Sequence, residues 1–556
     1  MRRLAPQILI ASALLLASCS SSGSDSSKAT TTTTAAPGKA AATGGHACDQ
    51  GATAKVTTAP VPGVASDQTM TSFDGTEIRL HWFPVDGADK ADPAPTILMG
   101  PGWSLAGDTS TDGAALFGAL SINGMHKAGY NVLTWDPRGF GASTGVATVN
   151  DPTKEGRDVQ GLLDFVAEQP EAKTDATGDP RVGMVGFSYG GGIQLTTAAI
   201  DCRIDAIVPG IAWHSLQTSL YKADTVKTGW SKILTSTVPE DRLDPHIVSA
   251  TKSGLGDGTL SDEDREWFIS RGPGDAVKDI DIPTLFVQGT VDTLFTLDEA
   301  TTNYGILRKD DVPTAMLWFC GGHGTCLTKA GDPDRVGKAS FEWLDKYLKG
   351  DATKIDADTN RLNLIDQDGV QWKAKDWPVA QGEPVTATGS GTLQLQADGG
   401  SGAGSITPPA GDPLGGLVAN ITPTKAENAV NVAIDPSTTD ALALGAPKLT
   451  FTYSGELTDP PAAPITRVFA QLVDDQTGLI LGNQITPIKV TLDGKSHTVD
   501  TPLEMIAHHL TPGHTLTLQI VATTSAYATP ALGGQITFPK IEISLPTAEA
   551  KAVTKG

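Results

Sequence analysis

Three residues far apart in this sequence have the side chains needed for nucleophilic attack on a carbonyl group. Ser188 lies in Gly186-Phe-Ser188-Tyr-Gly190, Asp292 in Gly-Thr-Val-Asp292, and His323 in Cys-Gly-Gly-His323-Gly-Thr-Cys. A serine hydroxyl attacks poorly near neutral pH unless an imidazole takes its proton and a carboxylate holds that imidazole in the right tautomer. These residue types, in the chain order serine, acid, histidine, predict covalent catalysis through an acyl-enzyme.

The segment around Ser188 has the pattern of a nucleophile elbow. An apolar strand over residues 182–187 precedes the serine, and small residues over 190–200 can form the helix that follows. Strand and helix pass so closely in such a turn that only glycine fits two positions before and two after the nucleophile. In a chain with 61 glycines the short motif can arise by chance, so its strand and helix setting carries the prediction.

Other residues compete for the acid and base roles. Asp292 could instead cap a turn after its strand. Asp275 and Asp281 precede that strand and would lie at the opposite end of the sheet. His323 directly follows a predicted parallel strand in a glycine-rich loop, whereas His214 could line the substrate pocket. The C-terminal half holds three further histidines for which we expect surface or packing roles: His508, His509 and His514.

An oxyanion intermediate needs two preorganised donors, and losing one typically costs about 3 kcal/mol of transition-state stabilisation. We expect one donor to be the backbone N–H of Tyr189, directly after the nucleophile. The second is expected in the loop after residues 96–100, from the N–H of either Gly102 or Trp103.

The elements that must position these residues form an α/β pattern. Short runs that are apolar on both faces alternate with helical stretches, which predicts a parallel sheet covered by helices on both sides. The predicted strands are residues 96–100, 131–136, 182–187, 206–211, 284–289 and 314–319. A hairpin over residues 70–84 precedes them, and a helix ending at Gly350 closes the unit, so the catalytic domain is predicted over residues 51–350. An insertion at about residues 214–280 is predicted to form a helical cap over the acyl pocket.

A second domain is predicted over residues 351–556. Residues 399–405 have the composition of a Gly/Ser linker, and alternating strands follow without a notable helix. These strands, at residues 448–453, 466–473, 485–492, 514–521 and 535–543, predict a β-sandwich of the jelly-roll kind.

The N-terminus has the pattern of a lipoprotein signal peptide over residues 1–18. Two arginines precede a ten-residue apolar run, too short to span a bilayer, and Leu-Ala-Ser-Cys19 matches a bacterial lipobox. We therefore expect lipidation of Cys19, a flexible tether over residues 19–50, and an extracytoplasmic protein anchored to the cell membrane. The formal net charge of -22 argues against nucleic acid as a partner. Nothing in the sequence indicates the oligomeric state.

Four cysteines follow the leader, and an even number in an exported chain is typical of disulfides. Cys320 and Cys326 bracket His323 symmetrically, so a bridge between them would pin the histidine loop and leave Cys48 to pair with Cys202. The alternative is a metal site of Cys320, His323 and Cys326, but it lacks a fourth ligand, and a metal-bound histidine could not act as a base. We expect neither a metal nor a cofactor.

Together these stretches resemble the cocaine-esterase and X-Pro dipeptidyl-peptidase family of α/β-hydrolases over roughly residues 65–545. Further matches are Asp-Pro-Arg138-Gly-Phe-Gly, Trp267-Phe-Ile-Ser-Arg-Gly-Pro before residues 282–289, and residues 503–513 with the strand after them. The resemblance implies an α/β-hydrolase fold with a helical cap, a catalytic triad of Ser188, Asp292 and His323, and cofactor-free hydrolysis. Members commonly place a tyrosine hydroxyl in the oxyanion hole, where this chain has Gly102-Trp103.

The predicted function is hydrolysis of an ester or amide, with a small ester and a proline-containing peptide both open as substrates. Acidic cap residues could recognise the α-amine of a peptide. The same triad supports acyl transfer to an envelope acceptor when water is excluded. A non-catalytic binding lipoprotein with a vestigial α/β part is the alternative from another class, and the intact order of the triad argues against it.

Overall fold

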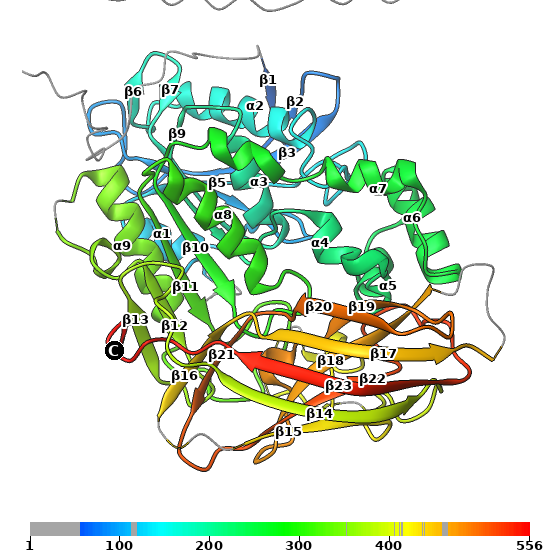
Figure 1. Ribbon diagram of the computed structural model, residues 1–556. Coiled ribbons are helices and arrows are strands. Elements are labelled where there is room, and N and C mark those ends of the chain that lie inside the picture. The colour runs from blue at the N-terminus through cyan, green and yellow to red at the C-terminus, as the bar shows by residue number, and fades with distance from the viewer. Residues whose placement is uncertain are drawn as a thin grey trace, which may run out of the picture. The chain divides into compact units, whose positions relative to one another are not determined.

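The computed structural model describes residues 56–112, 119–351, 353–404, 406–410, 412, 415–435, 438, 440–458 and 465–556. Within them, a 12-stranded sheet has the order β1-β2-β3-β5-β4-β8-β9-β10-β11-β12-β13-β24 (Figure 1). Its strands are β1 Thr57–Pro60, β2 Asp67–Thr71, β3 Glu77–Phe83, β4 Thr96–Gly100, β5 Asn131–Trp135, β8 Val182–Phe187, β9 Ile204–Gly210, β10 Thr284–Gly289, β11 Thr314–Phe319, β12 Leu362–Ile365, β13 Gln371–Ala374 and β24 Val553–Lys555.

The strands from β5 to β12 pair in parallel, and those outside them pair antiparallel. The parallel strands are buried along nearly their whole length because helices cover both faces. Core residues of α2 Glu155–Ala167, α3 Tyr189–Ala198 and α8 Leu297–Lys309 pack on one face. Those of α1 Ile122–Lys127 and α9 Arg335–Lys349 pack on the other. This architecture confirms the predicted α/β-hydrolase fold.

The helical cap lies between β9 and β10. It consists of α4 Leu216–Leu220, α5 Thr228–Ser236, α6 Pro245–Gly256 and α7 Asp262–Ile269. Its apolar residues belong to a core cluster that includes Trp230 and Ile247 of the cap together with Tyr189 and Phe295 outside it. A minor hairpin of β6 Thr174–Ala176 and β7 Asp179–Pro180 lies between α2 and β8 in the chain.

The large sheet does not end near Gly350, where a boundary was predicted. Gly350 does end α9 in a left-handed conformation, but β12 then pairs in parallel with β11. β13 follows β12, and the C-terminal strand β24 returns to pair with β13. These strands have only three or four residues each, too short for their apolar pattern to stand out in the sequence.

Two four-stranded sheets form the C-terminal sandwich, β14-β23-β17-β20 and β15-β22-β18-β19. Their inner faces share one apolar core. The elements of this region are β14 Val385–Gln394, α10 Gly415–Val418, β15 Ala429–Ile434, β16 Ala441–Gly445, β17 Lys448–Glu456, β18 Ile465–Asp474, β19 Thr486–Thr491, β20 His497–Pro502, β21 Ile506–Leu510, β22 Leu516–Val521 and β23 Gln535–Leu545. The predicted Gly/Ser linker is instead packed against the sandwich: the Ser401 hydroxyl is buried and donates to Gln471 at 2.7 Å.

The predicted signal peptide, Cys19, Cys48 and the tether lie outside the described residues. Within the described part of the chain, no helix combines the length and apolar character needed to cross a bilayer.

Candidate active site

The turn between β8 and α3 holds Ser188 in a strained conformation. Its backbone angles are φ 58° and ψ -118°, in a region that residues with a side chain rarely adopt. The flanking glycines make the turn possible, because a Cβ atom on Gly190 would lie 2.1 Å from the carbonyl oxygen of Gly100, and one on Gly186 would lie 2.7 Å from the same atom. The strain and the close packing together project the Ser188 side chain from the carboxyl end of the sheet.

The structure brings Ser188, His323 and Asp292 together from three separate strand ends. Nε2 of His323 lies 2.7 Å from Oγ of Ser188, and Nδ1 of the same ring lies 2.8 Å from Oδ2 of Asp292. His323 and Asp292 are buried, and Trp230 and Phe295 pack edge-on against the imidazole. This is the geometry needed for proton transfer from the hydroxyl to the imidazole.

The carboxylate of Asp292 is fixed by its own loop. Its second oxygen, Oδ1, accepts the backbone N–H groups of Leu294 at 2.9 Å and Phe295 at 2.8 Å. The loop of His323 packs just as tightly, because a Cβ atom on Gly324 would lie 1.8 Å from the carbonyl oxygen of Val291. The Asp292 and His323 loops therefore pack tightly against each other, and Oδ2 of Asp292 is free to accept from the imidazole of His323.

A buried lysine of the cap supports the same loop. The ammonium of Lys227 donates to the carbonyl oxygens of Thr293 at 2.9 Å and Leu294 at 3.1 Å. Burial lowers the pKa of Lys227 to about 8, so the group remains largely cationic at pH 7 and its two hydrogen bonds are charge-assisted. The indole of Trp230 adds a bond to the hydroxyl of Thr293 at 3.0 Å, and that hydroxyl donates to the carbonyl of His323 at 3.1 Å.

Two consecutive amides of the sandwich also bind the backbone of these loops. The side-chain amide of Gln484 donates to the carbonyl of Asp292, and that of Asn483 donates to the carbonyl of Thr325, each at 2.8 Å. All four residues are buried. The sequence analysis did not identify Asn483, Gln484 or Lys227, because no local pattern marks a residue whose partner is a backbone carbonyl far away in the chain.

A disulfide joins Cys320 and Cys326 across the histidine loop, which confirms that part of the cysteine prediction. It also removes the alternative metal site, since the two sulfurs are bonded to each other. Cys202 is disulfide-bonded as well, and its predicted partner, Cys48, lies outside the described residues.

The loop proposed to complete an oxyanion hole lies beside the elbow. The indole N–H of Trp103 donates to the carbonyl of Leu234 in the cap at 2.9 Å, so this side chain is engaged and only the backbone of Gly102 or Trp103 is available. The hydroxyl of Tyr189 donates to Glu155 at 2.9 Å, and burial together with that carboxylate raises the Tyr189 pKa well above its usual value. The Tyr189 side chain is thus a structural anchor for the helix that follows the nucleophile.

A cavity of about 650 Å³, open to solvent on one side, adjoins Ser188. Its lining is apolar apart from hydroxyl groups, and a second hollow of about 440 Å³ shares part of that lining and continues between the cap helices. The shared residues are Leu216, Leu220, Ser231, Thr251 and Phe268. His214, an alternative pocket residue, is not among the lining and instead lies 2.8 Å from Asn303 on α8.

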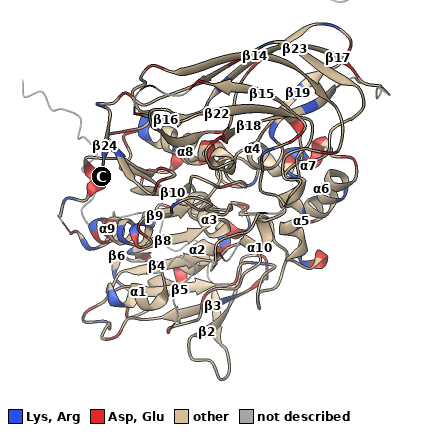
Figure 2. Ribbon diagram, turned by 90° about the horizontal axis from the view of Figure 1, so that it is seen from below, with Lys and Arg blue, Asp and Glu red and all other residues tan. Residues whose placement is uncertain are grey.

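The acidic residues of the cap do not line this cavity. Asp262, Glu263 and Glu266 are exposed on α7, where Figure 2 shows charges of both signs. Asp264 is buried but accepts the hydroxyls of Ser261 and Ser249, at 2.8 and 2.9 Å. No described residue that lines the cavity beside Ser188 carries a carboxylate, an ammonium or a guanidinium, whereas Arg265 lines the second hollow.

The chain is similar to a known protein family and to several solved structures. Residues 74–325 match the model of the X-Pro dipeptidyl-peptidase (S15) family. Solved structures that resemble the chain include an alpha-amino acid ester hydrolase, with 14% identity and a TM-score of 0.63 over 88% of this chain and 98% of that one. A CocE/NonD family hydrolase from Staphylococcus aureus is 13% identical with a TM-score of 0.58, over 89% of this chain and 97% of that one. An aminopeptidase from a Thaumarchaeota archaeon is 13% identical with a TM-score of 0.60, over 88% of this chain and 98% of that one. At these identities the structures show a shared fold.

Curated relatives match shorter segments. A polyketide transferase from a Penicillium species is 25% identical over 144 residues, which are 26% of this chain and 43% of that protein. An uncharacterised 31.7 kDa protein from Escherichia coli is 31% identical over 91 residues, 16% of this chain and 30% of its own length. The chain thus spans less than half the length of these relatives.

Proposed function

With residues 74–325 matching the X-Pro dipeptidyl-peptidase (S15) family, a family of hydrolases, we propose that this protein is a serine hydrolase that cleaves esters through an acyl-enzyme on Ser188. The observation that carries the proposal is the continuous relay from Oγ of Ser188 to Nε2 of His323 at 2.7 Å and from Nδ1 to Asp292 at 2.8 Å. Asp292 orients the imidazole and stabilises its cationic form as the hydroxyl proton is transferred.

The reaction has two halves. In the first, His323 takes the proton of Ser188, Oγ bonds to the substrate carbonyl carbon, and the imidazolium returns the proton to the leaving group as the scissile bond breaks. In the second, a water molecule gives its proton to His323 and attacks the acyl carbon, and Ser188 leaves with that proton restored. The backbone N–H of Tyr189, with that of Gly102 or Trp103, would stabilise the oxyanion in both halves.

The cavity favours a neutral, apolar acyl group over an X-Pro dipeptide. A dipeptide would bring a charged α-amine, and burying an ammonium without a carboxylate partner is costly. The described lining offers hydroxyls from Ser231, Thr235 and Thr251 but no carboxylate.

Specificity for acyl length is the direct test. We expect kcat/KM for p-nitrophenyl esters to rise about fourfold per added methylene from acetate until the cavity is filled, since each buried methylene contributes about 0.8 kcal/mol. Ala-Pro and Gly-Pro p-nitroanilides are expected to be far poorer substrates. Leu220→Trp, which fills the junction of the two hollows, should abolish the gain for the longer esters while sparing acetate.

Leu255→Trp is the matched control, because Leu255 lies on cap helix α6 but is 39% exposed and does not line the cavity. It should retain the wild-type profile. Faster turnover of the proline anilides than of every ester would contradict the substrate class and establish a peptidase. A profile that is flat with chain length in the wild type would show that the acyl group binds elsewhere.

Acyl transfer is a second candidate, favoured by the apolar lining around the nucleophile. The chain also resembles a protein described as a polyketide transferase, over 26% of its length, and this likeness supports acyl transfer. Butanol added to the ester assay separates the two outcomes: transfer yields the butyl ester, and hydrolysis yields the free acid alone.

We further propose that the mature chain is anchored outside the cytoplasm through a lipid on Cys19. The support is the lipobox-like Leu-Ala-Ser-Cys19 after an apolar run and the Ser- and Thr-rich stretch that follows. Expression in a bacterial host with an alkyne-labelled fatty acid should give a labelled, membrane-associated protein. Cys19→Ala should abolish the label and release the protein, whereas equal labelling of both forms would contradict the anchor.

A further inference from the structure

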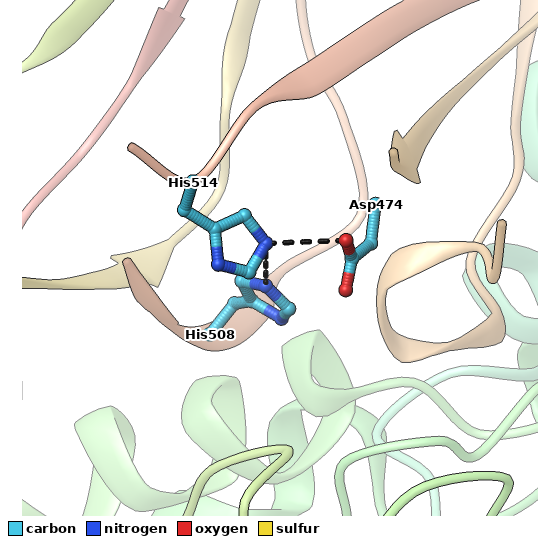
Figure 3. Close-up of side chains that lie close together, drawn as sticks. All are labelled: Asp474, His508 and His514. Carbon is cyan, nitrogen blue, oxygen red and sulfur yellow. Dashed lines mark hydrogen bonds and ion pairs between the residues drawn. The ribbon is translucent and has the colours of Figure 1, made fainter. Parts of the chain in front are cut away.

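Three buried side chains of the sandwich point at one another, far from the nucleophile in sequence. Asp474 ends β18, His508 lies on β21, and His514 precedes β22. Figure 3 shows Nε2 of His514 between the carboxylate of Asp474 and the ring of His508. The sequence predicted surface or packing roles for these two histidines, and both are buried, with exposed fractions of 5% and 8%.

The distances match the edges of a tetrahedral metal site. Nε2 of His514 lies 3.4 Å from Nε2 of His508 and 3.2 Å from Oδ1 of Asp474. Zinc bonds to nitrogen and carboxylate oxygen are about 2.0–2.2 Å, so two ligands of one tetrahedral ion lie about 3.3–3.5 Å apart. All three ligand atoms lie within 4.8 Å of one another, so one tetrahedral ion could bind all three once the widest separation has shortened to a tetrahedral edge.

The chemistry of the three groups also fits a cation. Both histidines are buried, and a neutral imidazole offers the lone pair of its unprotonated ring nitrogen to a metal ion. The Asp474 carboxylate is oriented by the backbone N–H of Gln476, which donates to Oδ1 at 2.9 Å. Outer hydrogen bonds of this kind commonly hold metal ligands in place. In the metal-free alternative, His514 shares its Nε2–H between two acceptors, the carboxylate of Asp474 and Nε2 of His508.

The cluster is accessible from outside. Asp474 and His508 line a polar cavity of about 500 Å³, which offers an entry path and room for a water ligand. The same cavity is lined by Thr290, Cys320 and Asn483, the last of which binds the backbone of the histidine loop. The cluster therefore lies near the part of the sandwich that supports the histidine loop.

We propose that Asp474, His508 and His514 form a binding site for a divalent first-row transition metal, of which zinc is the representative, with solvent completing the coordination. Two imidazoles and one carboxylate suit such an ion and suit Mg²⁺ poorly, since Mg²⁺ prefers an octahedron of oxygen ligands. The site is structural and independent of the proposed hydrolase chemistry.

Zinc titration of the purified, chelator-treated protein tests the site. We expect one Zn²⁺ per chain by calorimetry, no response to Mg²⁺, and a higher unfolding temperature with zinc. Co²⁺ should give the intense visible absorption of tetrahedral coordination. His508→Ala and His514→Ala should each weaken zinc binding at least tenfold and abolish the zinc-dependent rise in unfolding temperature.

His497→Ala is the matched control, because His497 pairs with Asp493 at 2.7 Å on the surface of the same domain. It should bind zinc as the wild type does. Zinc binding that survives both cluster variants, or a wild type that binds none, would overturn the proposal in favour of a hydrogen-bonded cluster. If a cluster variant does not fold, the wild-type Co²⁺ spectrum decides, since an octahedral or absent spectrum excludes the site.

Discussion

Ser188→Ala is expected to lower kcat for ester hydrolysis by about 10⁵- to 10⁶-fold and to abolish labelling by a fluorophosphonate probe. The substitution removes Oγ, the atom that we propose bonds the acyl carbon, which lies 2.7 Å from Nε2 of His323. Because serine and histidine act as one unit, His323→Ala should cost about as much, and the double variant no more than either single one. Initial rates and intact-mass spectra of the labelled proteins measure both effects.

Ser231→Ala provides the control for this experiment. Ser231 lines the same cavity, but its hydroxyl donates to the carbonyl of Lys227 at 3.2 Å and contacts no imidazole. Its kcat and its labelling should stay near wild type. Labelling that persists in Ser188→Ala, or losses that multiply in the double variant, would show that the nucleophile lies elsewhere.

Asp292→Asn should lower kcat/KM by about 10⁴-fold at neutral pH while leaving the fold intact. The backbone N–H groups of Leu294 and Phe295 hold Oδ1, so the new amide must keep its oxygen there and turn its NH₂ toward Nδ1 of His323. Nδ1 then becomes an acceptor and the ring proton moves to Nε2. An Nε2 that carries a proton cannot take another from Ser188, and the relay stops.

Rates measured across pH, with unfolding temperature as the check on folding, test this tautomer argument. Asp281→Asn is the control, since Asp281 precedes β10 and lies away from the strand end that bears Asp292. Its activity should remain within about twofold of wild type, as is usual for exposed positions. An Asp292→Asn variant that retains a tenth of the wild-type rate would contradict the orienting role.

The sequence predicted the central strands and the positions of the triad residues, because both depend on local residue patterns. Each central strand is apolar on both faces and ends in residues that allow a tight turn, so β4, β8, β10 and β11 begin and end where their residue patterns place them. The proximity of Ser188, Asp292 and His323 follows from the same pattern, because carboxyl ends of neighbouring parallel strands meet at one edge of a sheet.

Features that arise from contacts between distant segments were not predictable in this way. Ser401 lies in a stretch whose composition resembles a flexible linker, yet it is buried through a bond to Gln471. Lys227 has no sequence signal of its own, because its acceptors are backbone carbonyls 66 and 67 positions away. His508 and His514 look like ordinary strand residues until the sandwich places Asp474 beside them.

The amides of Asn483 and Gln484 have a consequence for how activity first appears. They reach carbonyls 158 and 192 positions earlier in the chain, so the loops of His323 and Asp292 are synthesised well before the residues that clamp them. A nascent or truncated polypeptide that stops short of these amides carries every reacting group but lacks the clamp. Activity is therefore expected only after residues 483 and 484 have been made, and chains that end before them should not hydrolyse esters.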